Sequence, residues 1–252
     1  MNRFGIGGQN AGQVRDALGI GFSQTMVSRI NDRLDVDVLV IDIHGDAYVM
    51  KVAGRHVLVT KRTTSWFRQN FSLAHELGHI AANTFHAPIT GSEASTETAA
   101  NAFAAELLMP EKEIRALEWR TMSTVEFARC IWDFGVSTEA LVNRLSGLHL
   151  PLSPNIEAVR DQNTFALLRH FWVSETTQMD QVDLISVRRE RSAQRYIPPE
   201  LIGQLEASVL AGRAPKESLA FLLDIPVDEL DLGIEDSCDL NEDASLLESI
   251  LS

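Results

Sequence analysis

The sequence has few cysteines and no long apolar run. Its two cysteines, Cys130 and Cys238, lie far apart in segments of different character, and two cysteines cannot form the disulfide framework of a small secreted protein. No apolar run approaches the ~20 residues that a membrane-spanning helix needs. The first 16 residues are polar and glycine-rich and lack the apolar stretch of a secretory signal. We therefore expect a cytoplasmic protein with reduced thiols and no membrane segment.

Basic residues are absent after Lys216. The last 36 residues contain eleven of the 35 acidic residues, so nearly all of the formal net charge of −13 lies in this acidic tail. Such a tail repels nucleic acid. The rest of the chain is nearly neutral. Its 252 residues, 45% of them hydrophobic and 23% charged, are enough for one domain of about 110–150 residues and smaller units.

Hydrophobic periodicity predicts an α+β fold. Residues 10–34 should form two short helices, split by Gly19 and Gly21. Three strand patterns follow, and turn signals between them favour a small antiparallel three-stranded meander. The sheet should pack on a helix over 66–83, with a second helix over 95–109; the expected strands are 36–43, 47–52 and 56–60. Gly78 in the middle of the first helix indicates a close neighbouring backbone, although it can simply be tolerated there.

Prolines mark the expected domain boundaries. Pro110 ends the second long helix, because proline cannot continue it. We predict an α+β domain over 1–110 and a helical, helix-turn-helix-like extension over 111–153. A mixed and helical C-terminal region with the acidic tail should follow over 154–252, with helices after Pro199 and around 215–223.

The motif that carries chemistry is His75-Glu76-Leu77-Gly78-His79. On a helix its histidines lie about 40° apart and one turn along the same face, so both imidazoles can bind one ion at about 2.0–2.1 Å. Glu76 lies about 100° round from His75, which suits contact with a water on that ion rather than ligation. The motif predicts a zinc site with Glu76 as general base. The alternative is a pair of surface histidines on an ordinary helix.

A catalytic zinc also needs a third protein ligand and one position for water. The candidates are Glu93 in a loop, and Glu97 and Glu106 on the next helix, where their separation points them about 180° apart. We choose Glu97, because Asn101 lies one turn later on the same face and can hydrogen-bond a liganding imidazole or carboxylate. Glu106 is expected on an outer face. Zn²⁺ suits these ligands, and Mn²⁺ or Fe²⁺ can use the same set.

Two stretches resemble a known family. Residues 71–79 (FSLAHELGH) and 97–110 (ETAANAFAAELLMP) closely resemble the ImmA/IrrE metallopeptidases. The resemblance is specific over about residues 10–110 and looser through 111–150. It implies a gluzincin-like zinc peptidase in which His75, His79 and Glu97 bind the metal and Glu76 is the base.

The resemblance also implies a protein substrate. Known members cleave DNA-binding repressors in mobile-element induction, stress response or phage defence. Many carry an N-terminal repressor-like helix-turn-helix, whereas the first ten residues here lead straight into the peptidase pattern. The expected partner is therefore a separate helix-turn-helix regulator encoded nearby. An extended segment of it can pair with an edge strand near the metal.

Direct nucleic-acid binding is expected to be weak or absent. Residues 125–148 have a helix-turn-helix outline, but the presumed reading helix, 138–145, has one Arg and one Glu, and half of its residues are Ala, Leu or Val. A major-groove reader needs several polar or basic side chains, so support of the peptidase core is preferred. The four arginines between Arg188 and Arg195 are interpreted as a solvated linker, with weak nucleic-acid contact as the alternative.

Two questions stay open in the sequence. The group that stabilises the oxyanion is not identified, and His86, Tyr48 and Arg68 are the candidates. The competing class of function is a non-catalytic protein-binding or antitoxin-like module with a structural metal site. The presence of Glu76 argues against it, because a structural site needs no base.

Overall fold

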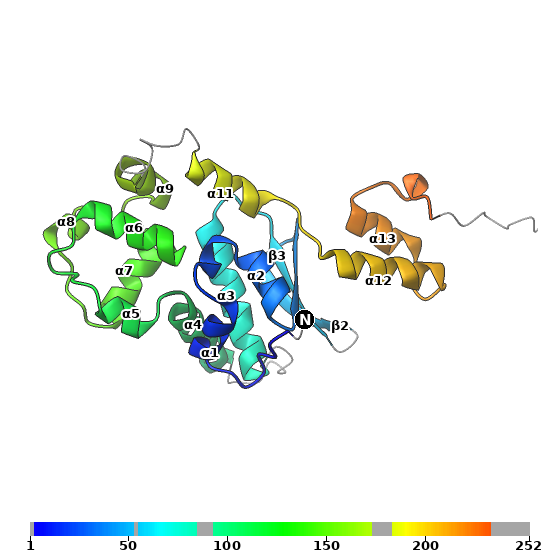
Figure 1. The fold of residues 1–252 in the computed structure, drawn as a ribbon, viewed down its shortest axis with the longest axis horizontal. Helices are drawn as coiled ribbons and strands as arrows, with labels where there is room; N and C mark the ends of the chain where they lie inside the picture. Colours follow the sequence, from blue (N-terminus) through cyan, green and yellow to red (C-terminus); the bar gives the residue numbers. More distant parts are fainter. Residues whose placement is uncertain (1–2, 53–54, 85–92, 173–182, 233–252) are drawn as a thin grey trace, which may run out of the picture. The chain divides into compact units, whose positions relative to one another are not determined.

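The computed structural model describes residues 3–52, 55–84, 93–172 and 183–232 (Figure 1). They form two compact units, one ending at Tyr196 and the other beginning at Ile197. The first unit holds a small sheet and most of the helices, which confirms the α+β class with helical extensions. The division after residues 110 and 153 stays a prediction. Among the described helices, none has the length and apolar character needed to cross a membrane.

The sheet has the order β1-β3-β2, with β1 (Val36–Ile41), β2 (Ala47–Val52) and β3 (Arg55–Lys61). β3 lies in the centre, parallel to β1 and antiparallel to β2. On the outer side of β1, Val40 exchanges two backbone hydrogen bonds with Tyr196. β2 is the other edge, and no described strand pairs with its outer side.

The predicted antiparallel meander is therefore wrong for β1, because the sheet is mixed. The prediction followed the tendency of sequential strands to pair. The burial of the three strands favours an order in which β3 lies between β1 and β2. All six residues of β1 are buried, as is usual for strands of parallel pairs, whereas Tyr48 and Met50 of β2 are 39% and 37% exposed. The two most buried strands lie side by side, and the half-exposed strand takes the edge.

The helices of the first unit begin close to where the periodicity predicts them. Gly19 and Gly21 separate the first helix from a short 3-10 turn and the second helix. The two long helices of the site, expected over 66–83 and 95–109, are confirmed within two residues at each end. The bounds up to these helices are α1 Ala11–Leu18, η1 Phe22–Gln24, α2 Met26–Arg33, α3 Trp66–Ala82 and α4 Glu93–Leu108.

α3 is the central helix of the first unit. Phe67 and Phe71 are only half-buried, whereas Leu73, Leu77 and Ile80 are fully buried. The buried face is broad because α3 packs against both the sheet and α4. In Figure 1 the sheet lies on one side of α3 and the extension helices on the other.

At Gly78 the backbone of α4 lies close to α3. A Cβ atom at this position would lie 3.1 Å from Ala100 Cα and 3.1 Å from Phe103 Cβ. The close neighbouring backbone indicated by the sequence is therefore present. Since α3 and α4 carry the candidate site residues, this contact sets the distance between the two halves of the site.

Gly78→Ala should lower the free energy of unfolding by about 1 kcal/mol. Overpacking costs about 1–3 kcal/mol, and the better helix propensity of alanine returns about 1 kcal/mol. Chemical denaturation of the full chain measures the difference. Gly147→Ala is the matched control, because a Cβ at Gly147 meets nothing within 4 Å and should be neutral or stabilising. Equal stability changes in the two variants would show that the α3–α4 contact is not tight.

The helical extension packs onto this core. Ser123 and Ser137 cap α6 and α7. α7 buries Leu141, Val142 and Leu145, and its only basic residue, Arg144, pairs with Glu106 of α4. These contacts make α7 part of the packed core, and the absence of DNA reading by it stays a prediction. The bounds are α5 Glu111–Arg115, α6 Thr124–Phe134, α7 Thr138–Gly147, α8 Pro154–Glu157, α9 Thr164–Leu167, η2 Leu168–Trp172 and α11 Leu184–Ala193.

The arginine-rich stretch is not a solvated linker, which corrects the sequence interpretation. Most of it forms α11, and Arg188 is only 5% exposed. Its guanidinium donates to Trp132 O at 2.9 Å and to Ser23 O at 2.8 Å. It also lies 4.9 Å and 4.8 Å from the ring centres of Trp66 and Trp132. The long apolar stem and two indole rings explain how a charged residue enters the interior.

The second unit is a small helical body. It contains the two helices expected after Pro199 and around 215–223, followed by a short 3-10 turn: α12 Pro199–Leu210, α13 Lys216–Leu223 and η3 Val227–Glu229. Most of the acidic tail, including Cys238, lies outside the described residues.

Candidate metal centre

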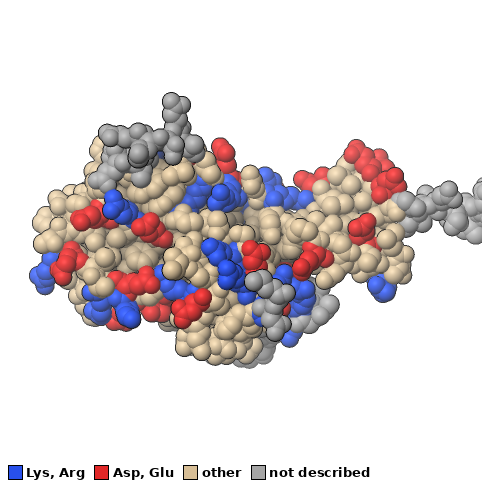
Figure 2. All heavy atoms as spheres, viewed as in Figure 1, with Lys and Arg blue, Asp and Glu red and all other residues tan. Residues whose placement is uncertain are grey.

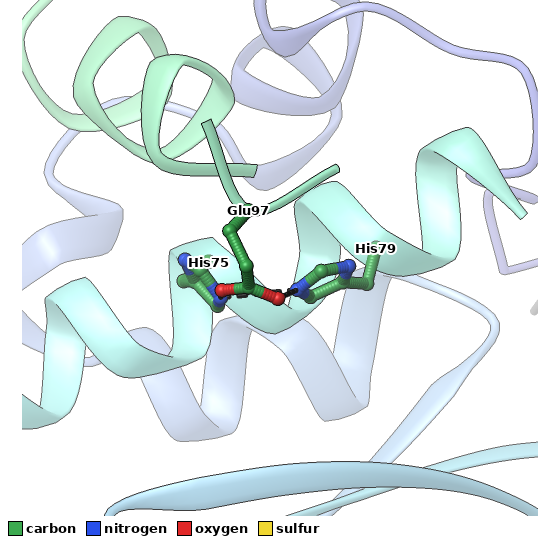
Figure 3. Close-up of side chains that lie close together, drawn as sticks. All are labelled: His75, His79 and Glu97. Carbon is green, nitrogen blue, oxygen red and sulfur yellow. Dashed lines mark hydrogen bonds and ion pairs between the residues drawn. The ribbon is translucent and has the colours of Figure 1, made fainter. Parts of the chain in front are cut away.

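His75 and His79 lie on one face of α3, one turn apart, and their rings converge (Figure 3). Their Nε2 atoms are 3.0 Å apart. Burial lowers the pKa of His79, and the neighbouring His75 lowers it further, against a smaller opposing effect of Glu97. A neutral imidazole is the form that binds a metal.

Glu97 reaches the same point from the first turns of α4. Its Oε2 lies 3.2 Å from His75 Nε2, and its Oε1 lies 3.2 Å from His79 Nε2. Glu93 begins α4 rather than lying in the preceding loop. Glu106 points elsewhere: it pairs with Arg144 and accepts from the backbone nitrogen of Glu111 at 3.3 Å. Among the side chains that the structure describes, Glu97 is the acid brought to the histidines.

The spacing of these three groups fits one zinc ion. Tetrahedral ligands at 2.0–2.1 Å from a metal are about 3.3 Å from one another, and the observed separations are 3.0–3.2 Å. The histidine side chains are 17% and 11% exposed, whereas that of Glu97 is 51% exposed. The site is therefore buried on the α3 side and open on the other, as a catalytic position with room for water requires.

A further pair of contacts fixes the orientation of both rings. Asn101 Oδ1 lies 3.0 Å from His75 Nδ1, as the sequence analysis expected. Thr84 Oγ1 lies 3.1 Å from His79 Nδ1, a contact that the sequence analysis missed. If each Nδ1–H donates to its oxygen, each Nε2 lone pair faces the common point, which is the tautomer that binding requires.

The position of Thr84 has a local cause. α3 ends at Asn83, which takes a left-handed conformation with φ 55°. This turn brings the next residue back beside the last turn of the helix, where Thr84 N donates to His79 O at 2.9 Å. Asparagine is one of the few residues that adopts this conformation readily, so Asn83-Thr84 after the motif is the signal that could have found this contact.

Glu76 lies beside the three candidate ligands and is half-buried. Burial raises the pKa of Glu76, His75 lowers it, and Glu97 raises it. A carboxylate with a raised pKa is a better proton acceptor than an exposed one. Its chemical role is therefore distinct from that of Glu97, which is more exposed and converges on the histidines.

The oxyanion-stabilising group stays unassigned. His86 lies outside the described residues. Tyr48 is on the exposed edge strand, and Arg68 is 3.9 Å from Asp46. None of the described contacts joins Tyr48 or Arg68 to the histidines.

A cleft of about 1150 Å³ begins one turn from the candidate metal centre. Ser72, four residues before Glu76, and Ala105, four residues after Asn101, lie on its wall. Because positions four apart share a helix face, the cleft continues along the faces of α3 and α4 that carry the site. Helix α7 and residues 160–165 form the opposite side, and the apolar part of the lining is Phe67, Phe71, Met109, Val136, Val142, Leu148 and Phe165.

An HExxH helix and a carboxylate from the following helix are the arrangement of the HExxH metallopeptidases. A comparison with protein families agrees with this class of protein and points to one family within it. Residues 31–146 match the IrrE N-terminal-like domain. This match supports the resemblance to the ImmA/IrrE family of metallopeptidases that was inferred from the sequence. A comparison with curated proteins finds no match.

Proposed function

We propose that this protein is a zinc-dependent endopeptidase of the cytoplasm that cleaves a specific protein partner, a DNA-binding regulator. The observation that carries the proposal is the convergence of His75, His79 and Glu97 on one point, with the separate carboxylate of Glu76 beside it. A purely structural site has no use for Glu76.

The division of roles follows from this geometry. A zinc ion held by the three groups would supply Lewis acidity and lower the pKa of a bound water to about 7. As uncharged imidazole ligands, His75 and His79 would leave the full charge of the ion available for this chemistry. Glu76 accepts the proton of the attacking water and then delivers it to the leaving amine. Asn101 and Thr84 hold the two imidazoles in the required orientation. Mn²⁺ or Fe²⁺ can occupy the same ligands.

The cleft supports a polypeptide substrate. Its volume of about 1150 Å³ exceeds the roughly 300–1,000 Å³ of pockets for small ligands. Its lining is partly aromatic and partly charged, which suits a peptide with mixed side chains. The outer side of β2 offers unpaired backbone groups, and an extended segment can add there as a further strand.

The regulator is proposed from the family resemblance. A protein partner that binds DNA separately agrees with the acidic charge of this chain, since the acidic tail repels nucleic acid. Specificity for one partner also fits a cytoplasmic location, where a peptidase of broad specificity would harm the cell.

The test mixes the full chain with the helix-turn-helix regulator encoded beside it. Fragments that form with Zn²⁺, fail to form with a chelator and form again when zinc is restored support the proposal. The chelator must also stop cleavage in a reaction that contains only the purified components. Tight binding of the intact regulator, unchanged by zinc and without fragments, would instead assign the protein to the binding-module class.

A further inference from the structure

One wall of the cleft beside the candidate metal centre comes from the helix-turn-helix outline of residues 125–148. Residues 136–137 of the turn line the cleft, and α7 adds Glu139, Ala140 and Asn143. Glu139 and Ala140 precede Asn143 by four and three residues, so the three positions share one face of the helix. Another face of α7 is buried in the core. The helix that a DNA-binding protein would use for reading therefore faces a cleft of this protein.

The wall across from α7 is aromatic. Phe67 and Phe71 line the cleft one turn apart on α3. Phe165 of α9 also lines it, and its ring centre lies 5.1 Å from the ring centre of Phe67. All three rings are only half-buried. Half-buried rings that line a cleft offer apolar contact area to a ligand.

Hydrogen bonds hold the walls of the cleft together. On the α3 side, Asn70 Nδ2 donates to Gly135 O at 3.0 Å, immediately before the turn residues that line the cleft. At the other end of α7, Arg144 Nε donates to Met109 O at 3.0 Å, just after α4 ends. These bonds join α7 to both helices of the metal centre. The cleft is therefore preformed, which lowers the ordering cost of binding.

The polar groups of the α7 wall suit a polypeptide better than nucleic acid. Glu139 and Asn143 are exposed, and neither side chain has a hydrogen bond or ion pair with another described residue. Arg144, the basic residue of α7, pairs with Glu106. Acidic and basic side chains are interspersed on the visible face of the extension helices (Figure 2), whereas a nucleic-acid surface needs clustered basic residues.

We propose that the cleft binds the substrate chain beside the scissile bond, with a large apolar side chain on the three phenylalanines and α7 as the wall that selects the partner. This inference rests on the proposed peptidase function, because the occupant is the substrate of that site. Phe71 precedes His75 by four residues, which is about 6 Å along the helix axis. Two residues of an extended chain span about the same distance. The apolar side chain therefore lies about two residues from the scissile bond.

The experiment measures the retention of random ten-residue peptides on the immobilised full chain. Glu76→Gln with Zn²⁺ is the background for every sample, so that peptides bind without being cleaved. Peptides eluted from this protein should be enriched at least threefold in phenylalanine, leucine, isoleucine and methionine over the starting library. Adding Asn143→Trp fills the cleft from an exposed position and should abolish the enrichment. Ser146→Trp is the matched control, because Ser146 is exposed on α7 but does not line the cleft.

Kinetics with the regulator give a second measurement, in the protein that keeps Glu76. Asn143→Trp should raise KM at least tenfold with little change in kcat, because it removes binding rather than chemistry. Ser146→Trp should cleave with the parent KM. A regulator that the parent leaves intact would refute the proposed function alone, since the peptide selection needs no cleavage.

Two results of the selection would overturn the cleft as a substrate site. The first is equal enrichment on the Asn143 and Ser146 variants. The second is retained peptides with the composition of the starting library. A ten-nucleotide single strand that binds the parent and is blocked by Asn143→Trp would assign the cleft to nucleic acid and also overturn the proposal.

Discussion

Replacing Glu76 by glutamine should reduce the rate of regulator cleavage by about 10²- to 10⁴-fold, which is the usual contribution of a general acid–base group. The amide has nearly the shape of the carboxylate but cannot accept a proton. Its neighbours His75 and His79 keep their positions on α3, so zinc affinity should change little. Single-turnover cleavage followed by gel densitometry measures the rate, and competition with a chromogenic chelator measures zinc affinity.

Glu118→Gln is the control for this substitution, because Glu118 is exposed and lies outside the cleft. It should cleave at the parent rate. Parent-like cleavage by the Glu76 variant would remove Glu76 from the mechanism. A large loss of zinc affinity would instead move Glu76 among the ligands, contrary to the separation of roles argued above.

Zinc should raise the thermal midpoint of the first unit by roughly 8–16 °C. At a free zinc concentration 1,000 times Kd, binding to the native state adds about 4 kcal/mol to the free energy of unfolding. Each kcal/mol raises the midpoint of a 150- to 250-residue protein by about 2–4 °C. Differential scanning calorimetry with and without a chelator tests this.

Two variants separate ligation from catalysis in the same measurement. His79→Ala removes one ligand and should abolish most of the zinc-dependent rise. Glu76→Gln should retain all of it. A rise of equal size in His79→Ala would mean that zinc stabilises the protein at another place, and the three-residue centre would then be wrong.

The sequence predicted which side chains of α3 and α4 lie together in the candidate metal centre. Two histidines four residues apart share a helix face whatever the tertiary fold, because helix geometry alone places them. Glu97 and Asn101 obey the same rule on the next helix, and Pro110 marks where that helix stops. Predicting the site then required only one long-range assumption, that the two helices pack against each other. The close contact at Gly78 shows that they do.

The non-local parts could not be predicted in this way. The order of the strands depends on which faces are covered, and the two-sided burial of β1 results from the whole packing. Arg188 was expected to be solvated because arginine usually is. It is buried because Trp66 and Trp132, 122 and 56 positions away in the chain, converge around its guanidinium. Periodicity within a segment contains no information about such partners.

The origin of the ligands on two successive helices has a consequence for how the protein acquires its ion. The pair on α3 exists as soon as that helix forms, whereas the carboxylate arrives only when α4 docks. Capture of an ion by this set and docking of α4 on α3 would therefore be one thermodynamic event, in which metal binding contributes directly to folding. For the proposed zinc enzyme, zinc starvation would free the start of α4, and the supply of zinc in the cell would control how much assembled protein exists.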